Sequence, residues 1–348
     1  MESQPAPSSR RGEIRPLRLE DIPELSALLR AAFKAPDDAR FASAEMLGWK
    51  FLQPQAFTRD PLSYVMRVDG RIVAHAGLQR ATMRSGSGAM LRCGTIIDWV
   101  ADSSMPGAGI AVYRHAMHQS EATFLIGGVP ATQSVATKLG FRSLFTARVY
   151  TRWVRPLREF LRRPKSAHAA LRLLHGVVHS PLAPLAPRRD WSAAPVEQFD
   201  HTIAPVLDAA APHSLAVRSV ESLNHRLKCP SRSMRAWVLR RRGGIAGCAL
   251  ASIGAWEARI LEVRLARAHA DAWAAAIAVV TDALGREQRV CRISALTSAP
   301  AVQHALELNR YWFRGSESVS FYDPGTRVAA HLPIDVTFFD SDIDFYSA

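Results

Sequence analysis

The sequence predicts two tandem domains of the α/β (α+β) class, each a mixed β-sheet with helices on both faces. The chain has 348 residues, about twice the usual length of one domain. Its first half alternates strand and helix patterns in the order β-α-β-β-β-α-β-α-β, which is typical of a sheet covered by helices. Three motifs of that half then recur in the same order in the second half.

Residue patterns place each element of the first half. A strand is expected over 15–19, and the helix after it carries apolar residues at helical spacing from Ile22 onward. The dipeptide Asp69-Gly70 favours a type I′ hairpin between strands at 64–68 and 71–78. The remaining elements are a strand over 93–101, a helix over 110–118, a strand over 123–126, a helix over 133–139 and closing strands from Phe141.

The recurring motifs indicate a duplication of whole domains. Their separations are nearly constant, as small insertions and deletions between two copies would require. The matched pairs are Glu45–Pro54 with Glu221–Pro230, Asp69–Gly77 with Arg242–Ala249, and Pro130–Gln133 with Pro300–Gln303.

The net charge of +13 is concentrated between the two copies. Residues 152–190 hold nine Arg or Lys against two acids, and five prolines interrupt them. We interpret this stretch as a linker between domains at 13–151 and 191–348, with solvated arginines and short helices over 157–161 and 169–178. The alternative is a basic amphipathic element that binds anionic lipid or an acidic partner. Nucleic acid is not favoured, because no recognition motif accompanies the charge.

Several protein classes are excluded by composition. No apolar run approaches the ~20 residues of a membrane span, and the N-terminus does not read as a secretory signal. The four cysteines have neither zinc-ligand spacing nor a disulfide framework, and the histidine spacings suit no metal. We therefore expect a cytoplasmic protein without a metal.

Three stretches resemble the GNAT superfamily of N-acetyltransferases. They are the opening Arg15–Pro23, the loop Asp-Ser-Ser-Met-Pro-Gly-Ala-Gly-Ile-Ala at 102–111, and Lys-Leu-Gly-Phe-Arg at 138–142. The loop resembles the family's acetyl-CoA loop, usually Asp-Pro-x-x-Arg/Gln-Gly-x-Gly-Ile-Gly. The resemblance covers 13–151 and, more faintly, 191–323. The paired domains, Trp49-Lys50 and the Asp-rich end at 339–344 look like a bacterial subgroup of tandem acetyltransferase-like proteins.

The glycine-rich loop at 102–111 has backbone features that suit anion binding, apart from any resemblance. A glycine-rich turn that opens a helix presents unpaired N–H groups at the helix's positive end, where a pyrophosphate binds well. The resemblance implies the pyrophosphate of acetyl-CoA, the acyl donor. An ordinary flexible turn is the alternative, since Gly-x-Gly is common. The residues expected to bind the cofactor are Trp99, Ala101, Gly107, Ala108, Gly109, Ile110 and Ala111.

Asp98, on the strand that leads into the loop, is the candidate general base. A carboxylate there could take the proton of an attacking amine. The alternative is an Asp paired with a neighbouring cation, and Glu262 occupies the matching place in the second half. Trp49 and His75 are the candidate acceptor-binding residues, although both suit a structural role in the core.

The expected function is acyl-CoA-dependent transfer of an acetyl group directly to an amine, with a small-molecule or sugar amine as acceptor. Pro106 and Ala136 depart from the family's loop Arg or Gln and its Tyr acid, which favours a pseudoenzyme scaffold as one alternative. Aminoacyl transfer from charged tRNA is another. The second half lacks the glycine loop and is interpreted as a degenerate copy. Its acidic end, 335–344, could cover basic surface or hold a cationic acceptor.

Overall fold

The structure, a computed structural model, describes residues 12–53, 60–84, 89–162, 185–209, 217–267, 269–328 and 334–346. The chain divides into two compact units. Of the described residues, those within 12–53, 60–80 and 94–120 form the first unit, and those within 81–93 and 121–346 form the second. The short helix expected over 169–178 lies outside the described residues.

The first unit contains the predicted opening strand, hairpin and helices. Its strands are neighbours in the order β1-β2-β3-β4, and β1–β2 and β2–β3 pair antiparallel. The ends of β3 and β4 belong to the second unit. The elements are β1 (Glu13–Pro16), α1 (Ile22–Phe33), α2 (Ala44–Phe51), β2 (Ser63–Val68), β3 (Arg71–Arg84), β4 (Met90–Ala101) and α3 (Ala108–Met117).

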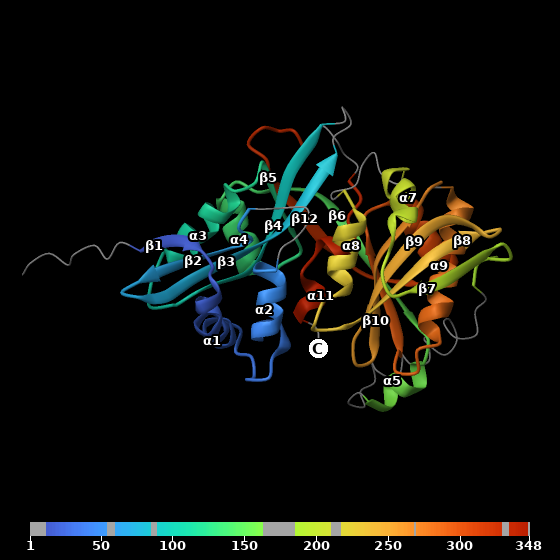
Figure 1. Ribbon diagram of the computed structural model, residues 1–348, viewed down its shortest axis with the longest axis horizontal. Coiled ribbons are helices and arrows are strands. Elements are labelled where there is room, and N and C mark those ends of the chain that lie inside the picture. The colour runs from blue at the N-terminus through green and yellow to red at the C-terminus, as the bar shows by residue number, and fades with distance from the viewer. Residues whose placement is uncertain are drawn as a thin grey trace, which may run out of the picture. The chain divides into compact units, whose positions relative to one another are not determined.

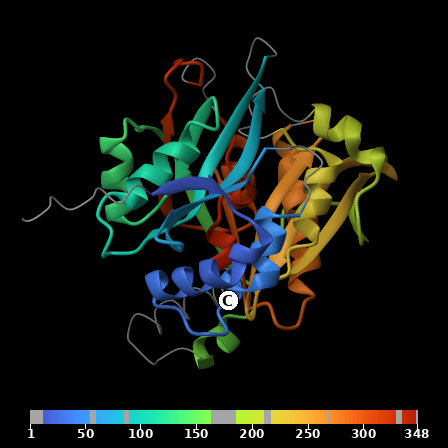
Figure 2. The same ribbon diagram turned by 60° about the vertical axis from the view of Figure 1, so that its left-hand side comes forward.

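Strand register shows which helix covers each face of this sheet. Val65 pairs with His75, and the ring of His75 contacts Phe51 of α2 at a centroid distance of 5.4 Å. The residue before Val65 in β2, Tyr64, contacts His115 of α3 at a centroid distance of 4.7 Å. Because successive side chains of a strand point to opposite faces, α2 and α3 cover opposite faces of the sheet (Figures 1 and 2).

The two matched hairpin turns have the same backbone conformation. Asp69 and Gly70 both have positive φ, at 50° and 78°, which confirms the predicted type I′ turn. Arg242 and Gly243 join β8 to β9 with φ of 49° and 82°. The second sequence match therefore corresponds to one local structure that occurs twice.

Eight strands that lie wholly in the second unit are neighbours in the sheet, in the order β5-β12-β6-β11-β10-β9-β8-β7. Among the strand pairs described for these eight, β10–β11 is parallel and the others are antiparallel. These strands are β5 (Ala122–Ile126), β6 (Arg142–Trp153), β7 (Trp191–Val196), β8 (Ser233–Arg241), β9 (Gly244–Ile253), β10 (Glu257–Leu265), β11 (Arg292–Thr297) and β12 (Trp312–Tyr322). The helices of the unit include α4 (Pro130–Lys138), α5 (Pro156–Arg162), α7 (Ala204–Ala209), α8 (Val220–Leu227), α9 (Ala270–Gly285), α10 (Pro300–Leu308) and α11 (Ile343–Tyr346).

The last strands of the two halves are exchanged in this sheet. β6, from the first half, pairs with β11 of the second, and β12 pairs with both β6 and β5. Sequence reasoning expected each half to keep its own sheet, because periodicity identifies a strand but not its partner. The mixed α/β class is confirmed, whereas the exchange was not anticipated.

The order of elements in the first half recurs in the second. Among the described elements, residues 13–153 and 191–322 each run strand, 3₁₀ turn, two helices, three strands, helix, strand, helix and strand, and the first range has a further 3₁₀ turn (Arg40–Ala42) between its two helices. Local contacts recur as well. Pro130 and Pro300 each begin a helix, and the Nε2 groups of Gln133 and Gln303 each donate to the carbonyl oxygen five residues earlier.

Two apolar clusters form the core of the second unit, one on each face of the sheet. One contains the buried face of α9 with Ala305 and Leu306 of α10. The other contains Leu223 of α8 together with Ile334, Val336 and Phe338 near the C-terminus. Figure 1 shows α8 in front of strands β8–β10 and α9 behind them. The alanine-rich α9 is buried along most of its length.

The start of the predicted linker is part of the folded unit. Arg152 is buried in β6 and donates to the carbonyl oxygen of Asn309. Arg155 donates to three carbonyl oxygens just beyond or at the end of α9, those of Gly285, Glu287 and Val290, at 2.6–2.9 Å. The expectation of solvated arginines is therefore wrong for these two, because carbonyls left over at a helix end attract cations.

Membrane-spanning helices, metal-ligand clusters and the state of the cysteines bear on the classes considered above. Within the described part of the chain, no helix is long and apolar enough to cross a membrane, and no group of three potential ligands could hold a metal ion. The four cysteines are all buried and free.

Candidate functional site

The predicted site in the first unit centres on a left-handed residue within β4. Asp98 has φ of 50°, a conformation that costs a non-glycine residue roughly 1 kcal/mol or more. Two side chains hold it. The Nζ of Lys50 donates to Oδ2 of Asp98 at 2.6 Å, and a ring nitrogen of His75 lies 2.7 Å from the Asp98 carbonyl oxygen.

The hydrogen bonds of His75 determine its tautomer. The carbonyl oxygen of Asp98 can only accept, so Nδ1 of His75 carries the proton and donates to it. Nε2 is left to accept from the hydroxyl of Ser63 at 2.7 Å. Burial lowers the pKa of His75 to about 4, and the nearby Lys50 charge acts in the same direction, against the opposing effect of Asp98. His75 is therefore neutral at pH 7 and fixes the backbone of β4.

The Asp98 carboxylate forms a buried ion pair. Its side chain is 0% exposed and that of Lys50 is 1% exposed. Lys50 also donates to the carbonyl oxygen of Phe41 at 3.2 Å. A substrate amine could transfer a proton to Asp98 only after Lys50 had moved aside or lost its charge. The role of Asp98 as general base stays a prediction with this condition attached.

Trp99, the next residue, faces α3 on the other side of the sheet. Its Nε1 donates to the carbonyl oxygen of Gly109 at 2.9 Å, and its ring contacts Tyr113 edge-on. A Cβ on Gly109 would lie 3.0 Å from the Cβ of Ala101 and 3.4 Å from Nε1 of Trp99. A glycine at 109 is thus required for α3 to pack against β4, a reason that the Gly-x-Gly motif did not reveal.

Gly107 has the open surroundings that a ligand requires. It precedes α3 with φ of 87°, is exposed, and a Cβ there would meet no described atom within 4 Å. The N–H of Ala108 donates to Met105 and that of Ala111 to Gly107. The N–H groups of Gly109 and Ile110 lie in the first turn, where helical carbonyl partners are missing, and no acid stands there.

Hydrogen bonds fix the loop ahead of Gly107. The Asp102 carboxylate accepts from the N–H and hydroxyl of Ser104 at 2.9 and 2.7 Å, which lowers the pKa of Asp102. Arg71 donates to the same carboxylate at 3.1 Å. The Asp102 N–H donates to Val73 at 2.7 Å, so the loop is tied to β3 as well. Gly107 therefore starts α3 from a fixed position.

The proposed acceptor residues lie in the core of the unit. Trp49 and His75 are both buried, and their part in substrate binding stays a prediction. Sequence reasoning did not identify Lys50 as the partner of Asp98. The signal was a lysine inside the apolar run Met46–Phe51, because a buried lysine needs a carboxylate.

The matching acid of the second half has more partners. Glu262 follows a register shift in β10, where Ile260 and Glu262 pair with consecutive residues of β9. Its side chain is 1% exposed. Oε2 accepts from Nε of Arg218 at 2.5 Å, and Oε1 lies 3.1 Å from Nε of Arg264.

The helix that follows β10 begins differently from α3. His269 precedes α9 with φ of −79°, and Asp271 stands in the first turn. A carboxylate at this end of a helix interacts favourably with its dipole and repels a phosphate. The first turn of α9 therefore disfavours the anion that the first turn of α3 would accept.

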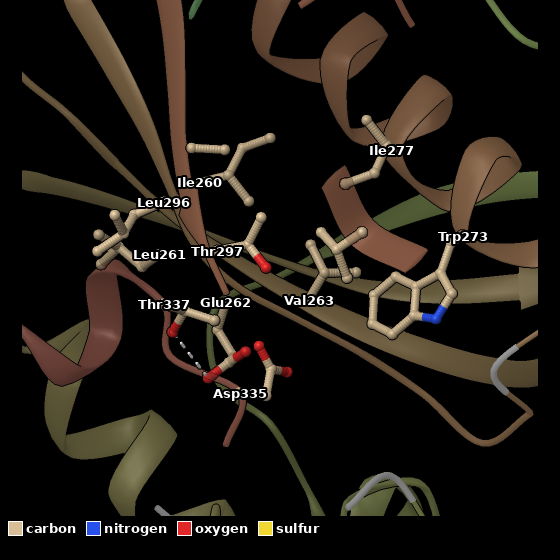
Figure 3. Close-up of a pocket in the computed structure, with 12 residues that line it drawn as sticks. Ile260, Leu261, Glu262, Val263, Trp273, Ile277, Leu296, Thr297, Asp335 and Thr337 are labelled. Atoms are coloured by element: carbon tan, nitrogen blue, oxygen red, sulfur yellow. Dashed lines mark hydrogen bonds between the residues drawn. The ribbon is translucent and has the colours of Figure 1, made fainter. Parts of the chain in front are cut away.

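A pocket opens where β10 and β11 separate. Their parallel pairing ends at Ile260 and Ala295, although both strands continue. The enclosed space is small, with room for about one water molecule. Figure 3 shows apolar side chains, among them Trp273 and Ile277 of α9, at one end, and the carboxylates of Glu262 and Asp335 at the other. No sequence pattern pointed to this pocket.

The C-terminal segment supplies one wall of the pocket. Thr337 forms an antiparallel bridge with Thr297, and Ser298 and Val336 are joined by two hydrogen bonds. Because β6 already pairs with Thr297 on the other edge of β11, the segment lies on the edge toward β10. Asp340 and Asp344 of this segment pair with the buried arginines Arg218 and Arg232, so these two acids balance core charges; whether the acidic end covers basic surface stays a prediction.

Comparison with known proteins supports the fold. No protein-family model and no curated protein matches the sequence. A GCN5-related N-acetyltransferase from Anabaena variabilis has a TM-score of 0.60 at 12% identity, over 90% of this chain and 73% of that one. A GCN5-related N-acetyltransferase from Kribbella flavida has a TM-score of 0.56 at 12% identity, over 89% of this chain and 71% of that one. The N-myristoyltransferase of Saccharomyces cerevisiae, solved with bound myristoyl-CoA, has a TM-score of 0.60 at 12% identity, over 92% of this chain and 85% of that one.

Proposed function

We propose that this chain, which has the fold of the GCN5-related N-acetyltransferases, is an acyl-CoA-dependent N-acyltransferase. In the proposed reaction an amine attacks the thioester carbonyl directly, without a covalent enzyme intermediate. The new bond joins the amine nitrogen to the acyl carbon, and the carbon–sulfur bond breaks. The amine's proton passes to a base, and the coenzyme A thiolate takes up a proton.

The start of α3 is the observation that carries this proposal. Gly107 leaves open space in front of the helix, and the N–H groups of Gly109 and Ile110 are the donors that a pyrophosphate would accept from. The N–H groups of Ala108 and Ala111, which the sequence also suggested, already have partners. Trp99 and Ala101 would hold the helix in place through their contacts with Gly109.

The proposed donor is acetyl-CoA, and the proposed acceptor is a small-molecule or sugar amine in the cytoplasm. The yeast neighbour was solved with myristoyl-CoA, so the length of the acyl group is a question for experiment. We assign the cofactor to the first half alone, because Asp271 in the first turn of α9 disfavours a phosphate. Asp98 remains the carboxylate to test as base.

Calorimetric titration of acetyl-CoA into the wild type and three glycine variants tests the proposal. Gly107→Asp places a negative charge in open space at the phosphate position, and we expect affinity to fall at least tenfold. Gly107→Asn has a similar shape without the charge and should lose less. Gly70→Asp is the matched control, because Gly70 also has positive φ and open surroundings but belongs to the β2–β3 turn.

Turnover and acyl length are then measured with amine acceptors and with acetyl-CoA and longer acyl-CoAs. Binding that Gly107→Asp removes and Gly70→Asp leaves intact supports the site. Equal loss in both variants would mean that strain at the turn, not phosphate contact, caused the effect. Binding without turnover for any acceptor would support the pseudoenzyme alternative. Absence of binding by the folded wild type would overturn the assignment of the cofactor.

A further inference from the structure

Several elements of the second unit meet at one end of its strands, where β6 finishes and β11 and β12 begin. Trp153, the last residue of β6, pairs with the first residue of β11, and Thr151 pairs with Trp312, the first residue of β12. Side chains that follow in the chain join this place to two helix ends, Arg155 to the end of α9 and Arg152 to the residue after α10. Figure 1 shows α5, which begins just after β6, below the strands of this unit. We call the exposed residues of α5, of 286–289 and of 307–312 the α5 end.

Large apolar side chains are exposed at the α5 end. Leu157 and Leu161 are 60% and 71% exposed, and because they are four residues apart in one helix they project from the same side of it. Glu159, between them in sequence, is buried and pairs with the first residue of β11, so the opposite side of α5 is the one that packs on the sheet. Leu308 and Trp312 are also close to half exposed. Exposed apolar side chains that gather within a polar rim are typical of an interaction surface.

Arginines accompany these apolar side chains. Arg158, Arg289 and Arg310 are exposed, and none of the three forms an ion pair with a described residue. Arg158 donates to the carbonyl oxygen of Gln288, which leaves its charge uncompensated. The neighbouring acids have partners within the chain, namely Asp282 with Arg286, Glu287 with Arg235, Glu159 with Arg292, and Glu307 with the hydroxyl of Tyr150. The α5 end therefore carries a net positive charge next to its exposed leucines.

We propose that the α5 end of the second unit docks on the surface of an anionic lipid bilayer, with Leu157 and Leu161 inserted among the lipids and Arg158, Arg289 and Arg310 at their phosphate groups. Aliphatic side chains enter hydrocarbon, an indole favours the interface, and guanidinium groups are attracted by anionic headgroups. A nucleic acid would pair with the arginines but leave the leucines exposed, because bases stack on aromatic rings and not on aliphatic chains. The surface does not depend on acyl transfer by the first half.

Vesicle flotation of the full chain, without acyl-CoA, tests the proposal. Vesicles of phosphatidylglycerol mixed with phosphatidylcholine are compared with vesicles of phosphatidylcholine alone, and we expect binding to the anionic vesicles to be about tenfold tighter or more. Leu161→Asp should weaken that binding about tenfold or more, because it removes an inserted apolar side chain and adds a charge that the lipids repel. Leu19→Asp is the matched control, since Leu19 is 75% exposed but lies before α1 in the first unit, and it should leave vesicle binding unchanged.

A second pair of variants tests the contribution of charge. Arg289→Gln should weaken binding to the anionic vesicles about threefold or more, whereas Arg142→Gln, at the exposed opposite end of β6, should not. Equal binding to both kinds of vesicle, no binding at all, or no effect of Leu161→Asp would each overturn the proposal. Binding of transfer RNA without binding of vesicles would assign the arginines to a nucleic acid and overturn it as well. None of these outcomes depends on whether the first half binds acetyl-CoA.

Discussion

Asp98 and Glu262 are matched acids on matched strands, yet they are neutralised in different ways. Asp98 pairs with Lys50, from the helix that covers its face of the sheet. Glu262 has two arginines, and these are shared with Asp335 and Asp340 from the end of the chain. Arg226, the sequence counterpart of Lys50, pairs with Asp344 instead.

The difference shows that matched positions of one fold can be packed as core in one half and border a pocket in the other. In the first half the acid is paired with a lysine of a neighbouring helix, and the residues around the pair are core. In the second half the C-terminal segment lies beside β11 and contributes carboxylates to the pocket. Among the described residues, Oδ1 of one of them, Asp335, has no hydrogen-bond partner. The following predictions test whether the two regions differ in this way.

The largest expected effect is in the first half. Lys50→Met leaves the Asp98 carboxylate buried without its cation, and we expect a loss of about 3–5 kcal/mol in the free energy of unfolding. Lys50→Met combined with Asp98→Asn should recover much of this loss, as measured by urea denaturation. Glu262→Gln should cost less, because Arg218 and Arg264 keep Asp340 and Asp335. A larger cost for Glu262→Gln would contradict the comparison.

The same double variant also examines the role of Asp98 in the reaction. If it folds and transfers acyl groups as the wild type does, Asp98 positions β4 and does not act as base. Loss of turnover at unchanged acetyl-CoA affinity would support the base assignment.

The second prediction concerns pH. The native chain resists protonation of His75, whose pKa is lowered to about 4, while the unfolded chain takes up the proton near pH 6.5. Stability is therefore fully present above pH 6.5 and is lost as pH falls toward 4, by up to about 3 kcal/mol. His75→Asn should be less stable but lack this pH dependence. Identical slopes in chemical denaturation would contradict the prediction. Asp335 acts in the opposite direction, because its raised pKa favours the native state as pH falls.

The smallest effects come from two glycines near the first-half site. Gly109→Ala places a Cβ against Ala101 and Trp99, and we expect it to destabilise the chain by about 1–3 kcal/mol. Gly48→Ala is the matched control, since it lies in α2 with nothing within 4 Å of a Cβ, and should stabilise by about 0.5–1 kcal/mol. Thermal unfolding separates the two, and a Gly109→Ala variant as stable as the wild type would remove the packing argument.

Local patterns predicted the elements well. The hairpin at Asp69-Gly70 and the glycine before α3 occur where the sequence indicated. The helix expected over 133–139 begins three residues earlier, at Pro130. Each depends on the backbone preferences of a few neighbouring residues, which a sequence shows directly. The roles assigned to Asp98, Trp49 and His75 could not be predicted from local backbone preferences, because they depend on what each side chain contacts.

The sequence by itself determined the mixed α/β class, the repeated order of elements and the loop that begins α3. Only the tertiary structure decided that β6 and β12 change places, that Lys50 neutralises Asp98, and that Asp335 reaches a pocket beside Glu262. Periodicity along a chain reports which side of an element is apolar, but partners 48 or 75 residues apart meet only after folding. These long-range contacts determine which charges are compensated and where a pocket remains.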